Sequence, residues 1–480
     1  MKRFIEGEDR SQITLFPDRL EDYVGEDNPV RVVDAFVDQL DLVGFGFSRV
    51  IPRRTGHPSY RCSELLKLHI YGYLNPVQSS RRLEREAARN VEVMWLIGRL
   101  VPDHKTIANF RKDNGRGIRK ACVQFVSLCR QFGLLAAASV AIDGAKFKAV
   151  NTRDKNFTKG KMQRRKAQIE ESVSRYLHQL DSADRQDPSL ARTAKIDHLN
   201  DKVVKLKAEM ERLAELEEEM LARPEQQISE TDPDARSMAT SGRGSGMVGY
   251  NVQIAVDTVN HLIVTHEVRN EGTDTSLLSH MGKRSKAALS ADKMEAVADR
   301  GYYKSDKILD CHNAGITVTL PKPQTSNNKA KGQFVKADFV YLPDDDVYRC
   351  PAGELLVYHY TNEERGLTLH RYWTNACRDC AIKDQCTTGK ERRITRWEHE
   401  DVLDEVQQRL DEHPEKMRQR RETVEHPFGT IKCWMGYTHF QMKTLKHVGT
   451  EMALHVLAYN LKRAMKILGI APLIAAMKAA

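Results

Sequence analysis

Apolar residues recur every three or four positions along most of the first 134 residues. The segments PVRVVDAFVDQLDL (29–42) and SELLKLHIYGYL (63–74) show this spacing, which predicts helices packed on one face. The segments SSRRLEREAARNVEVMWLIG (79–98) and VPDHKTIANFRKDN (101–114) predict basic helices separated by a turn. This arrangement is typical of a helix-turn-helix DNA reader, and an ordinary helical bundle with a solvated basic face fits it about equally well.

The pattern changes after residue 138. The run SVAIDGAKFKAV (139–150) is apolar and β-branched, which predicts a short strand ending at Asp143 and Gly144. Residues 161–221 then predict an antiparallel helical hairpin, because apolar residues alternate at steps of three and four. A disordered charged linker is the alternative for this stretch. The regular seam argues against it and comprises Ile196, Leu199, Val203, Leu206, Met210 and Leu213.

A mixed sheet is predicted for the middle of the chain. Residues 223–246 are rich in Pro, Ser, Gly and Asp, so we expect a loop there. The segments GYNVQIAVDT (249–258) and HLIVTHEV (261–268) predict a β-hairpin. Helix, strand, helix and strand patterns alternate over 275–321, which indicates a mixed α/β sheet. The chain is helical again from about residue 402.

Composition favours a globular protein with a polyanionic partner. The chain has 480 residues, 40% hydrophobic and 29% charged, and a net charge of +9. The stretch from Lys146 to Glu171 contains nine basic residues and three acidic ones. No apolar run reaches membrane-spanning length and the basic start lacks a signal-peptide core, so we expect a cytoplasmic, nucleoid-associated protein.

Two acidic residues follow apolar runs in the same way. Asp143 directly follows the run VAI, and Asp299 directly follows the run EAVA. If the two strands pair, these carboxylates can meet, and hard oxygen ligands suit Mg²⁺. A turn and a surface ion pair are the alternatives for each residue taken alone. Glu425 shares one side of a helix with Arg421 and Lys432, for which a salt-bridged amphipathic helix is the alternative.

Three motifs in this order resemble the DDE-type transposases of bacterial insertion sequences. They are AIDGAKF (141–147), ADRGYYKS (298–305) and VEHPFGTIK (424–432). The resemblance extends from about residue 16 to the C-terminal helix and includes VPDHKTIANFRK. It implies an α+β fold with an RNase H-like mixed-sheet catalytic core. Many relatives carry a tyrosine shortly before the arginine, whereas this chain has KMRQRR (416–421).

The resemblance also implies the catalytic residues. Asp143, Asp299 and Glu425 would be the catalytic carboxylates and would hold two Mg²⁺ ions, with Mn²⁺ as a substitute. Arg421 and Lys432 would accompany the glutamate and bind DNA phosphate. Lys146 and Lys148 follow the first strand along one edge and are further candidates for phosphate contacts, although lysines beside a turn are usually only solvated.

Four of the nine cysteines cluster late in the chain. Cys377 and Cys380 have the spacing of a zinc knuckle, Cys386 follows, and Cys350 precedes Pro-x-Gly. The cluster predicts a closed structural zinc site in a zinc-ribbon-like insertion. A set of unconnected surface thiols is the alternative, and His370 in place of one cysteine is another.

The sequence therefore predicts a DNA transposase with four parts. A helical DNA-binding domain spans 1–135, and the core spans 136–321 and 397–480, with a helical hairpin at 160–222 and a Cys-rich insertion at 322–396. The expected activity is Mg-dependent phosphodiester hydrolysis and strand transfer at terminal inverted repeats. Double-stranded DNA is the expected partner, bound by a dimer or larger assembly. A transposase-derived repressor without catalysis and an RNase H-like nuclease are the alternatives.

Overall fold

The computed structural model describes residues 19–52, 58–151, 155–185, 189–223, 225–239, 246–323 and 328–479. Compactness divides the chain into two units. The first comprises Met1–Ala136, Gly144–Gly272 and Glu425–Ala480, and the second comprises Ala137–Asp143 and Thr273–Val424. This division follows packing and not function, so the domain boundaries expected from the sequence stay a prediction.

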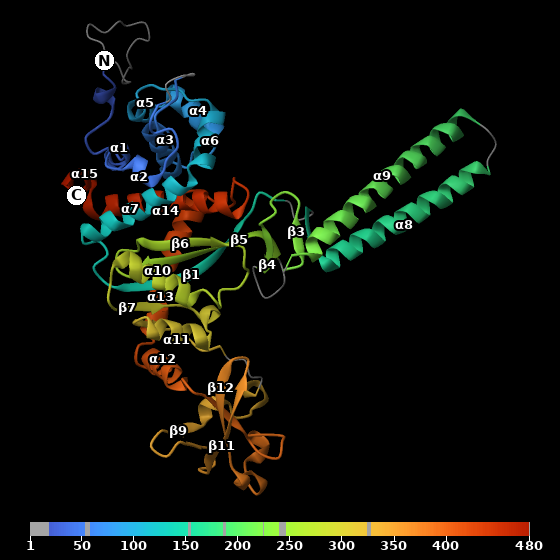
Figure 1. Cartoon of the computed structure of the whole chain (residues 1–480), viewed down its shortest axis with the longest axis vertical. Coiled ribbons are helices and arrows are strands. Elements are labelled where there is room, and N and C mark those ends of the chain that lie inside the picture. Colours follow the sequence, from blue (N-terminus) through green and yellow to red (C-terminus); the bar gives the residue numbers. More distant parts are fainter. Residues whose placement is uncertain are drawn as a thin grey trace, which may run out of the picture. The chain divides into compact units, whose positions relative to one another are not determined.

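Helices make up the N-terminal and C-terminal parts of the first unit (Figure 1). The prediction of helices over residues 28–134 is confirmed, because the chain there forms α1 (Val30–Asp38), α2 (Leu42–Phe45), α3 (Cys62–Leu74), α4 (Ser80–Arg89), α5 (Val91–Leu96), α6 (His104–Asp113) and α7 (Gly115–Gln131). The C-terminal helices are α14 (Leu445–Leu468) and α15 (Ile470–Ala479). A Cβ atom on Gly115 would lie 2.4 Å from Oγ1 of Thr450, so glycine permits α7 to approach α14 closely.

The long helices α8 (Lys159–Asp184) and α9 (Leu190–Leu221) lie side by side within the first unit (Figure 1). Their base carries the paired strands β2 (Asn156–Thr158) and β3 (Gln227–Ser229). Leu199, Val203 and Leu213 of the predicted seam are buried. An apolar cluster that includes Phe157 and Ile228 joins the strands to the helices. The seam therefore predicted the inner face of α9 correctly.

A mixed sheet runs through the strand β1 (Ser139–Lys148), which passes from the second unit into the first. In the first unit, β5 (Gly246–Asp257) pairs antiparallel with β4 (Arg236–Ala239) and with β6 (Ile263–Arg269). The strand order is β4-β5-β1-β7-β8, with β6 on β5. The predicted hairpin and mixed sheet are confirmed. The loop predicted over 223–246 is wrong in part, because β3 and β4 lie within it.

The second unit holds the parallel part of this sheet and the helices after it. β1 pairs parallel with β7 (Met294–Val297), which pairs parallel with β8 (Ile316–Thr319). The helices are α10 (Leu278–Leu289), α11 (Ser305–Asn313), α12 (Glu400–Glu412) and the first part of α13 (Glu415–Gly429). The chain is thus a mixed α+β protein.

The Cys-bearing part of the second unit is a separate antiparallel sheet (Figure 1). Its order is β13-β12-β11-β10-β9, formed by β9 (Val340–Leu342), β10 (Val347–Arg349), β11 (Leu355–Glu364), β12 (Leu367–Trp373) and β13 (Ile394–Trp397). Phe339, Tyr348, Leu356, Tyr372 and Ile394 form its apolar core. No helix within the described residues is both long and apolar enough to cross a membrane.

Candidate active site

Strand register places Asp143 and Asp299 at equivalent positions on neighbouring parallel strands. Ala141 of β1 pairs with Val297 of β7, and each aspartate follows two residues later. The expectation that the first strand ends at Asp143 is wrong, because β1 continues to Lys148. The pairing of β1 with β7 nevertheless stops at Ala141, so Asp143 lies beyond the last residue of that pairing.

A single arginine contacts both aspartates. Nη2 of Arg420 lies 2.6 Å from Oδ1 of Asp143 and 3.6 Å from Oδ2 of Asp299. The side chain of Arg420 is 14% exposed, that of Asp143 22% and that of Asp299 45%. The other oxygen of Asp299, Oδ1, accepts a hydrogen bond of 2.8 Å from the backbone N–H of Gly301. The pair is therefore partly buried, and one guanidinium group lies beside both carboxylates and balances only part of their negative charge.

The arginine beside the aspartates is Arg420, which the sequence did not single out, and not its predicted neighbour Arg421. Both belong to α13, but Arg421 is exposed, whereas Arg420 lies on the side of the helix that carries the buried residues Thr423 and Val424. Residues three and four positions apart share one face of a helix. The apolar spacing of α13 was thus the signal that distinguishes the two arginines.

Tyr302 is a second residue that the sequence did not single out. Its side chain is fully buried, and burial raises the pKa of its hydroxyl well above the ordinary value. The charges of Asp274, Asp143 and Asp299 raise this pKa further, and the charge of Arg420 lowers it. Three carboxylates therefore act on one buried phenol. Tyr302 belongs to the ADRGYYKS motif, and this motif was the sequence feature that could have identified it. No spacing pattern in the sequence identifies Asp274.

Of the three predicted catalytic carboxylates, the structure brings together Asp143 and Asp299. Glu425 belongs to the first unit, where it is exposed on α13, one helical turn after Arg421. The helix continues past Pro427, and its last residues lead into the π-helical turn η8 (Thr430–Trp434), which carries Lys432. The catalytic role of Glu425 stays a prediction.

The predicted DNA-binding lysines have contacts within the first unit. Nζ of Lys432 lies 4.5 Å from the ring centroid of Phe147 and donates to the backbone oxygen of Lys146 at 3.5 Å. Nζ of Lys146 donates to the backbone oxygen of Ala239 at 2.9 Å. Lys148 is exposed. Lys148 is thus the last residue of β1, Lys432 contacts the end of the same strand, and Lys146 donates to β4.

The donor chemistry of the aspartate pair fits a divalent cation. Two carboxylates already share one positive charge, and oxygen ligands of this kind suit Mg²⁺. Within the part of the chain that the structure describes, no three His, Cys, Asp or Glu side chains are grouped closely enough to hold a metal ion. A cation bound by Asp143 would compete with the guanidinium group of Arg420.

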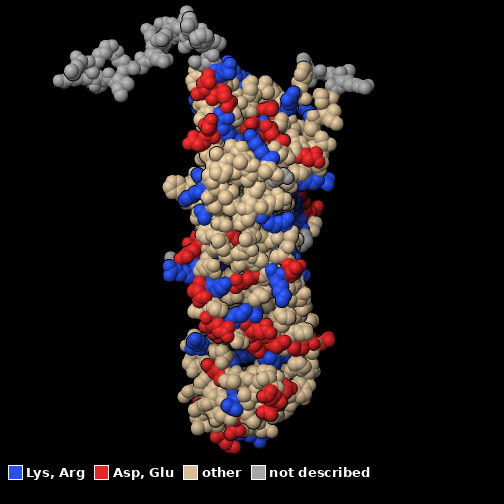
Figure 2. Space-filling model, turned by 90° about the vertical axis from the view of Figure 1, so that its left-hand side faces the viewer, with Lys and Arg blue, Asp and Glu red and all other residues tan. Residues whose placement is uncertain are grey.

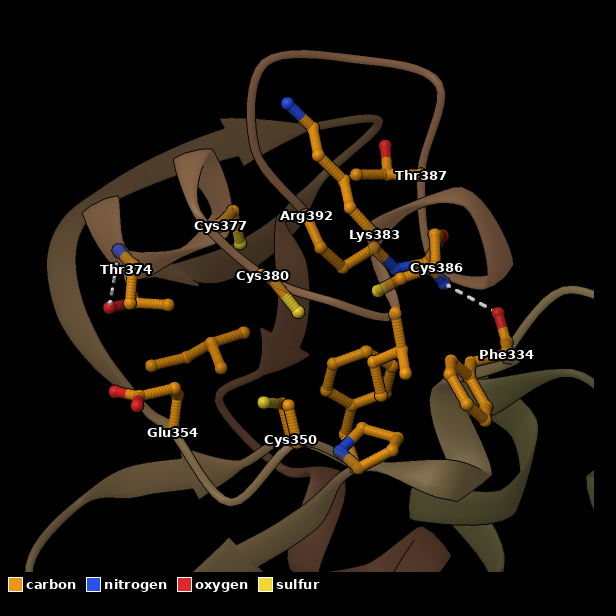
Figure 3. A pocket seen from close by; sticks show the side chains of 16 residues that line it. Phe334, Cys350, Glu354, Thr374, Cys377, Cys380, Lys383, Cys386, Thr387 and Arg392 are labelled. Carbon is orange, nitrogen blue, oxygen red and sulfur yellow. Dashed lines mark hydrogen bonds between the residues drawn. The ribbon is translucent and has the colours of Figure 1, made fainter.

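The four clustered cysteines line one cavity in the second unit. Figure 3 shows the thiols of Cys350, Cys377, Cys380 and Cys386 turned toward the same interior space. All four are reduced and partly buried. Burial raises the pKa of the Cys386 thiol, and the other three cysteines raise it further. The zinc ligands expected from the sequence therefore share a cavity, although the thiols are not grouped as a formed metal site.

His370 does not line this cavity. Its Nδ1 and Oγ1 of Thr361 form a hydrogen bond of 2.7 Å on the β11–β12 hairpin. The alternative in which His370 replaces a cysteine has no support in this arrangement.

The face of the molecule in Figure 2 carries no concentrated patch of positive charge. On the face in Figure 2, Lys and Arg side chains are interspersed with Asp and Glu, and a large area carries no charge. The net charge of +9 is therefore not gathered there. Individual helices and strands, and not this face as a whole, are the candidates for nucleic-acid contacts.

Two family models match separate parts of the chain. Residues 18–113 match a model described as "Transposase domain (DUF772)", and residues 349–465 match one described as "Transposase DDE domain". The second matched range includes Arg420, Glu425 and the cysteine cluster, but it does not include Asp143 or Asp299. Together these matches confirm the predicted resemblance to DDE-type transposases.

A solved structure of a piggyBac transposase synaptic complex with hairpin DNA, determined by cryo-EM, is a distant match. Its sequence is 8% identical, the alignment covers 94% of this chain and 79% of that chain, and the TM-score is 0.33. A likeness this low shows neither the fold nor the function of this chain. No curated protein matches the sequence.

Proposed function

We propose that the chain is a DNA transposase that cuts at the terminal inverted repeats of its own insertion sequence and joins the cut ends to target DNA. The observation that carries this proposal is the pair Asp143 and Asp299, which share the charge of Arg420 in a chain with two transposase domains. The order of the antiparallel and parallel strands around β1 supports an RNase H-like core.

Asp143, Asp299 and Glu425 are the proposed ligands of two Mg²⁺ ions, with Mn²⁺ as a substitute. Bound Mg²⁺ would supply charge stabilisation for the attacking and leaving oxygens of an in-line displacement. The carboxylates of this chain hold and orient that charge, and Arg420 holds the aspartates in place before DNA arrives. Burial and the aspartate charges raise the pKa of Tyr302, so its hydroxyl keeps its proton and can donate it in a hydrogen bond to an oxygen.

The reaction exchanges one phosphodiester bond for another. Water first attacks the phosphate at the element's end, which releases a 3′-hydroxyl, and that hydroxyl then attacks a phosphate of target DNA. The joining step forms one P–O bond and breaks one, so it needs no ATP. Arg421, Lys432 and Lys148 are the proposed phosphate contacts, and Lys146 is a weaker candidate because it donates to Ala239.

Double-stranded DNA is the proposed partner, bound at two ends by a dimer or larger assembly at the nucleoid. The helical region of residues 1–135 is the proposed end-binding domain. Zn²⁺ bound by Cys350, Cys377, Cys380 and Cys386 is the proposed structural cofactor, since these thiols share one cavity.

The test uses the full chain, Mg²⁺ and duplexes that carry the DNA flanking its gene. We expect nicks at matched inverted repeats and joining of the new 3′ ends to a target plasmid. Binding without nicking would favour the repressor, and nicking without joining would favour the nuclease. Either outcome would overturn the transposase proposal for this copy.

A further inference from the structure

The helices α4 and α6 carry an exposed positive face that the proposed catalytic site does not use. On α4, the exposed basic residues are Arg81, Arg82, Arg85 and Arg89. On α6, the exposed residues Lys105, Asn109 and Lys112 recur at steps of four and three, so they share one face. The two helices pack together within the first unit (Figure 1).

Packing fixes which face of α6 points outward. Ile107 is fully buried, and its backbone oxygen and Nε2 of His69 form a hydrogen bond of 2.9 Å. Arg111, which is 7% exposed, donates to the hydroxyl of Tyr73 at 2.7 Å. These contacts hold the inner face of the helix, so Lys105 and Asn109 must face away from the core.

The ends of the helix pair are fixed as well. Asp103 caps α6 by accepting hydrogen bonds from the backbone N–H groups of Lys105 at 2.9 Å and Thr106 at 3.1 Å. Nδ1 of His104 on α6 and Oε2 of Glu84 on α4 lie 2.9 Å apart. The helix pair therefore presents its outer side chains on a rigid support.

Four of the outer side chains of this helix pair are not used by the protein itself. In the residues that the structure describes, Arg81, Arg85, Lys105 and Asn109 make no side-chain hydrogen bond or ion pair. Arg89 is engaged by Glu86. Exposed cations of this kind are suited to a polyanion, and an exposed amide among them adds a group that can recognise a base edge.

We propose that α6 is the helix that reads DNA sequence, with Asn109 and Lys105 at base edges in the major groove, and that Arg81 and Arg85 of α4 bind the flanking phosphates. An amide can pair with adenine through two hydrogen bonds, and a lysine can donate to guanine. The exposed polar side chains of α4 are arginines, which fit phosphates. This inference rests on the proposed function, because it names the part of the chain that selects the DNA.

The experiment selects duplexes from a randomised 20-base-pair library with the full chain in buffer without added Mg²⁺, so that cleavage plays no part. We expect the unaltered chain to enrich one short sequence. Asn109→Ala should lose the preference at one or two adjacent base pairs and bind the enriched duplex about 10-fold or more weakly. Asn109→Gln should shift the preference at the same position.

The phosphate contacts have a different signature. Arg81→Ala with Arg85→Ala should weaken binding to enriched and unrelated duplexes alike, and should reduce the slope of log affinity against log salt by about two. Lys462→Ala, an exposed charge on α14, is the matched control and should change neither quantity. Thermal unfolding of each variant checks that it is folded.

Two results would overturn the inference. One is that the unaltered chain enriches no sequence. The other is that folded Asn109→Ala and Lys105→Ala variants enrich the same sequence as strongly as the unaltered chain, which would mean that another element reads the DNA. A chain that selects DNA through Asn109 but never nicks it with Mg²⁺ would leave this inference standing and remove the catalytic proposal.

Discussion

The second unit contains two candidate metal sites that differ in how their ligand side chains avoid uncompensated negative charge. The carboxylates of Asp143 and Asp299 share the guanidinium group of Arg420. The four clustered cysteines line a cavity beside the apolar core of the Cys-bearing sheet. Partly buried carboxylates need a counter-charge, whereas thiols can remain protonated and neutral.

This difference predicts which positive charge a metal ion displaces at each site when it binds. At the aspartate pair, a divalent ion competes with an arginine, so the protein exchanges one cation for another. At the cysteine cluster, a zinc ion displaces protons, because the thiolate is the ligand. A buried group without a counter-charge stays neutral, and the predictions below test this contrast.

The largest effect is expected for Asp143→Ala. Loss of this carboxylate should reduce Mg-dependent nicking of terminal-repeat DNA by about 1,000-fold or more, because metal ions contribute several kcal/mol to stabilising the transition state. Binding to the same DNA should change little. Nicking is measured on labelled duplexes, with Asp306→Ala on α11 as the control. Unchanged nicking in a folded Asp143→Ala variant would contradict the assignment.

The next effect concerns the cysteine cluster. Cys377→Ser together with Cys380→Ser should lower the free energy of unfolding by roughly 3 kcal/mol, since structural zinc contributes directly to folding. Elemental analysis of the unaltered chain should find about one zinc per chain. The exposed Cys433→Ser is the matched control. The zinc proposal would be wrong if the unaltered chain contained no zinc and the double variant had the same free energy of unfolding as the unaltered chain.

A smaller effect is expected for Arg420→Met. Without the guanidinium group, two neighbouring carboxylates lose their shared counter-charge, so the free energy of unfolding without added Mg²⁺ should fall by about 2 kcal/mol. Mg²⁺ should restore part of this loss, because an ion that binds only the folded state stabilises it. Urea unfolding with and without Mg²⁺ gives the comparison, and Arg421→Met is the exposed control. Equal losses in both conditions would be inconsistent with a cation site.

The smallest effect concerns a buried neutral group outside both sites. Burial, assisted by the charge of Arg111, lowers the pKa of His69 to about 3. The unfolded chain binds the proton at the ordinary pKa of about 6.5, so acid favours unfolding, and stability is lost as the pH falls from about 6.5 toward 3. Between pH 7.5 and 5.5, His69→Gln should lose about 1.4 kcal/mol less than the unaltered chain. Parallel pH profiles of the two proteins would contradict this.

The alternation of apolar and polar positions predicted most secondary structure. The helices of residues 28–134 and the seam of α9 follow from local spacing, because burial of one face leaves a period in the sequence. The strand β4 did not follow, since residues 236–239 lie within a stretch rich in Pro, Ser, Gly and Asp and become a strand through pairing with β5. Strand formation of this kind depends on a partner that is distant along the chain.

The two aspartates, the cysteine cluster and the transposase motifs could be identified from the sequence by itself, because each depends on residue type and short spacing. Only the tertiary structure decided that Arg420, and not Arg421, contacts the aspartates, and that Tyr302 is buried where their charges raise its pKa. Neighbouring residues on a helix differ by about 100° in direction, so the packing of α13 selects which arginine faces the carboxylates. Contacts between residues almost 300 positions apart depend on the strand register and helix orientation that folding sets.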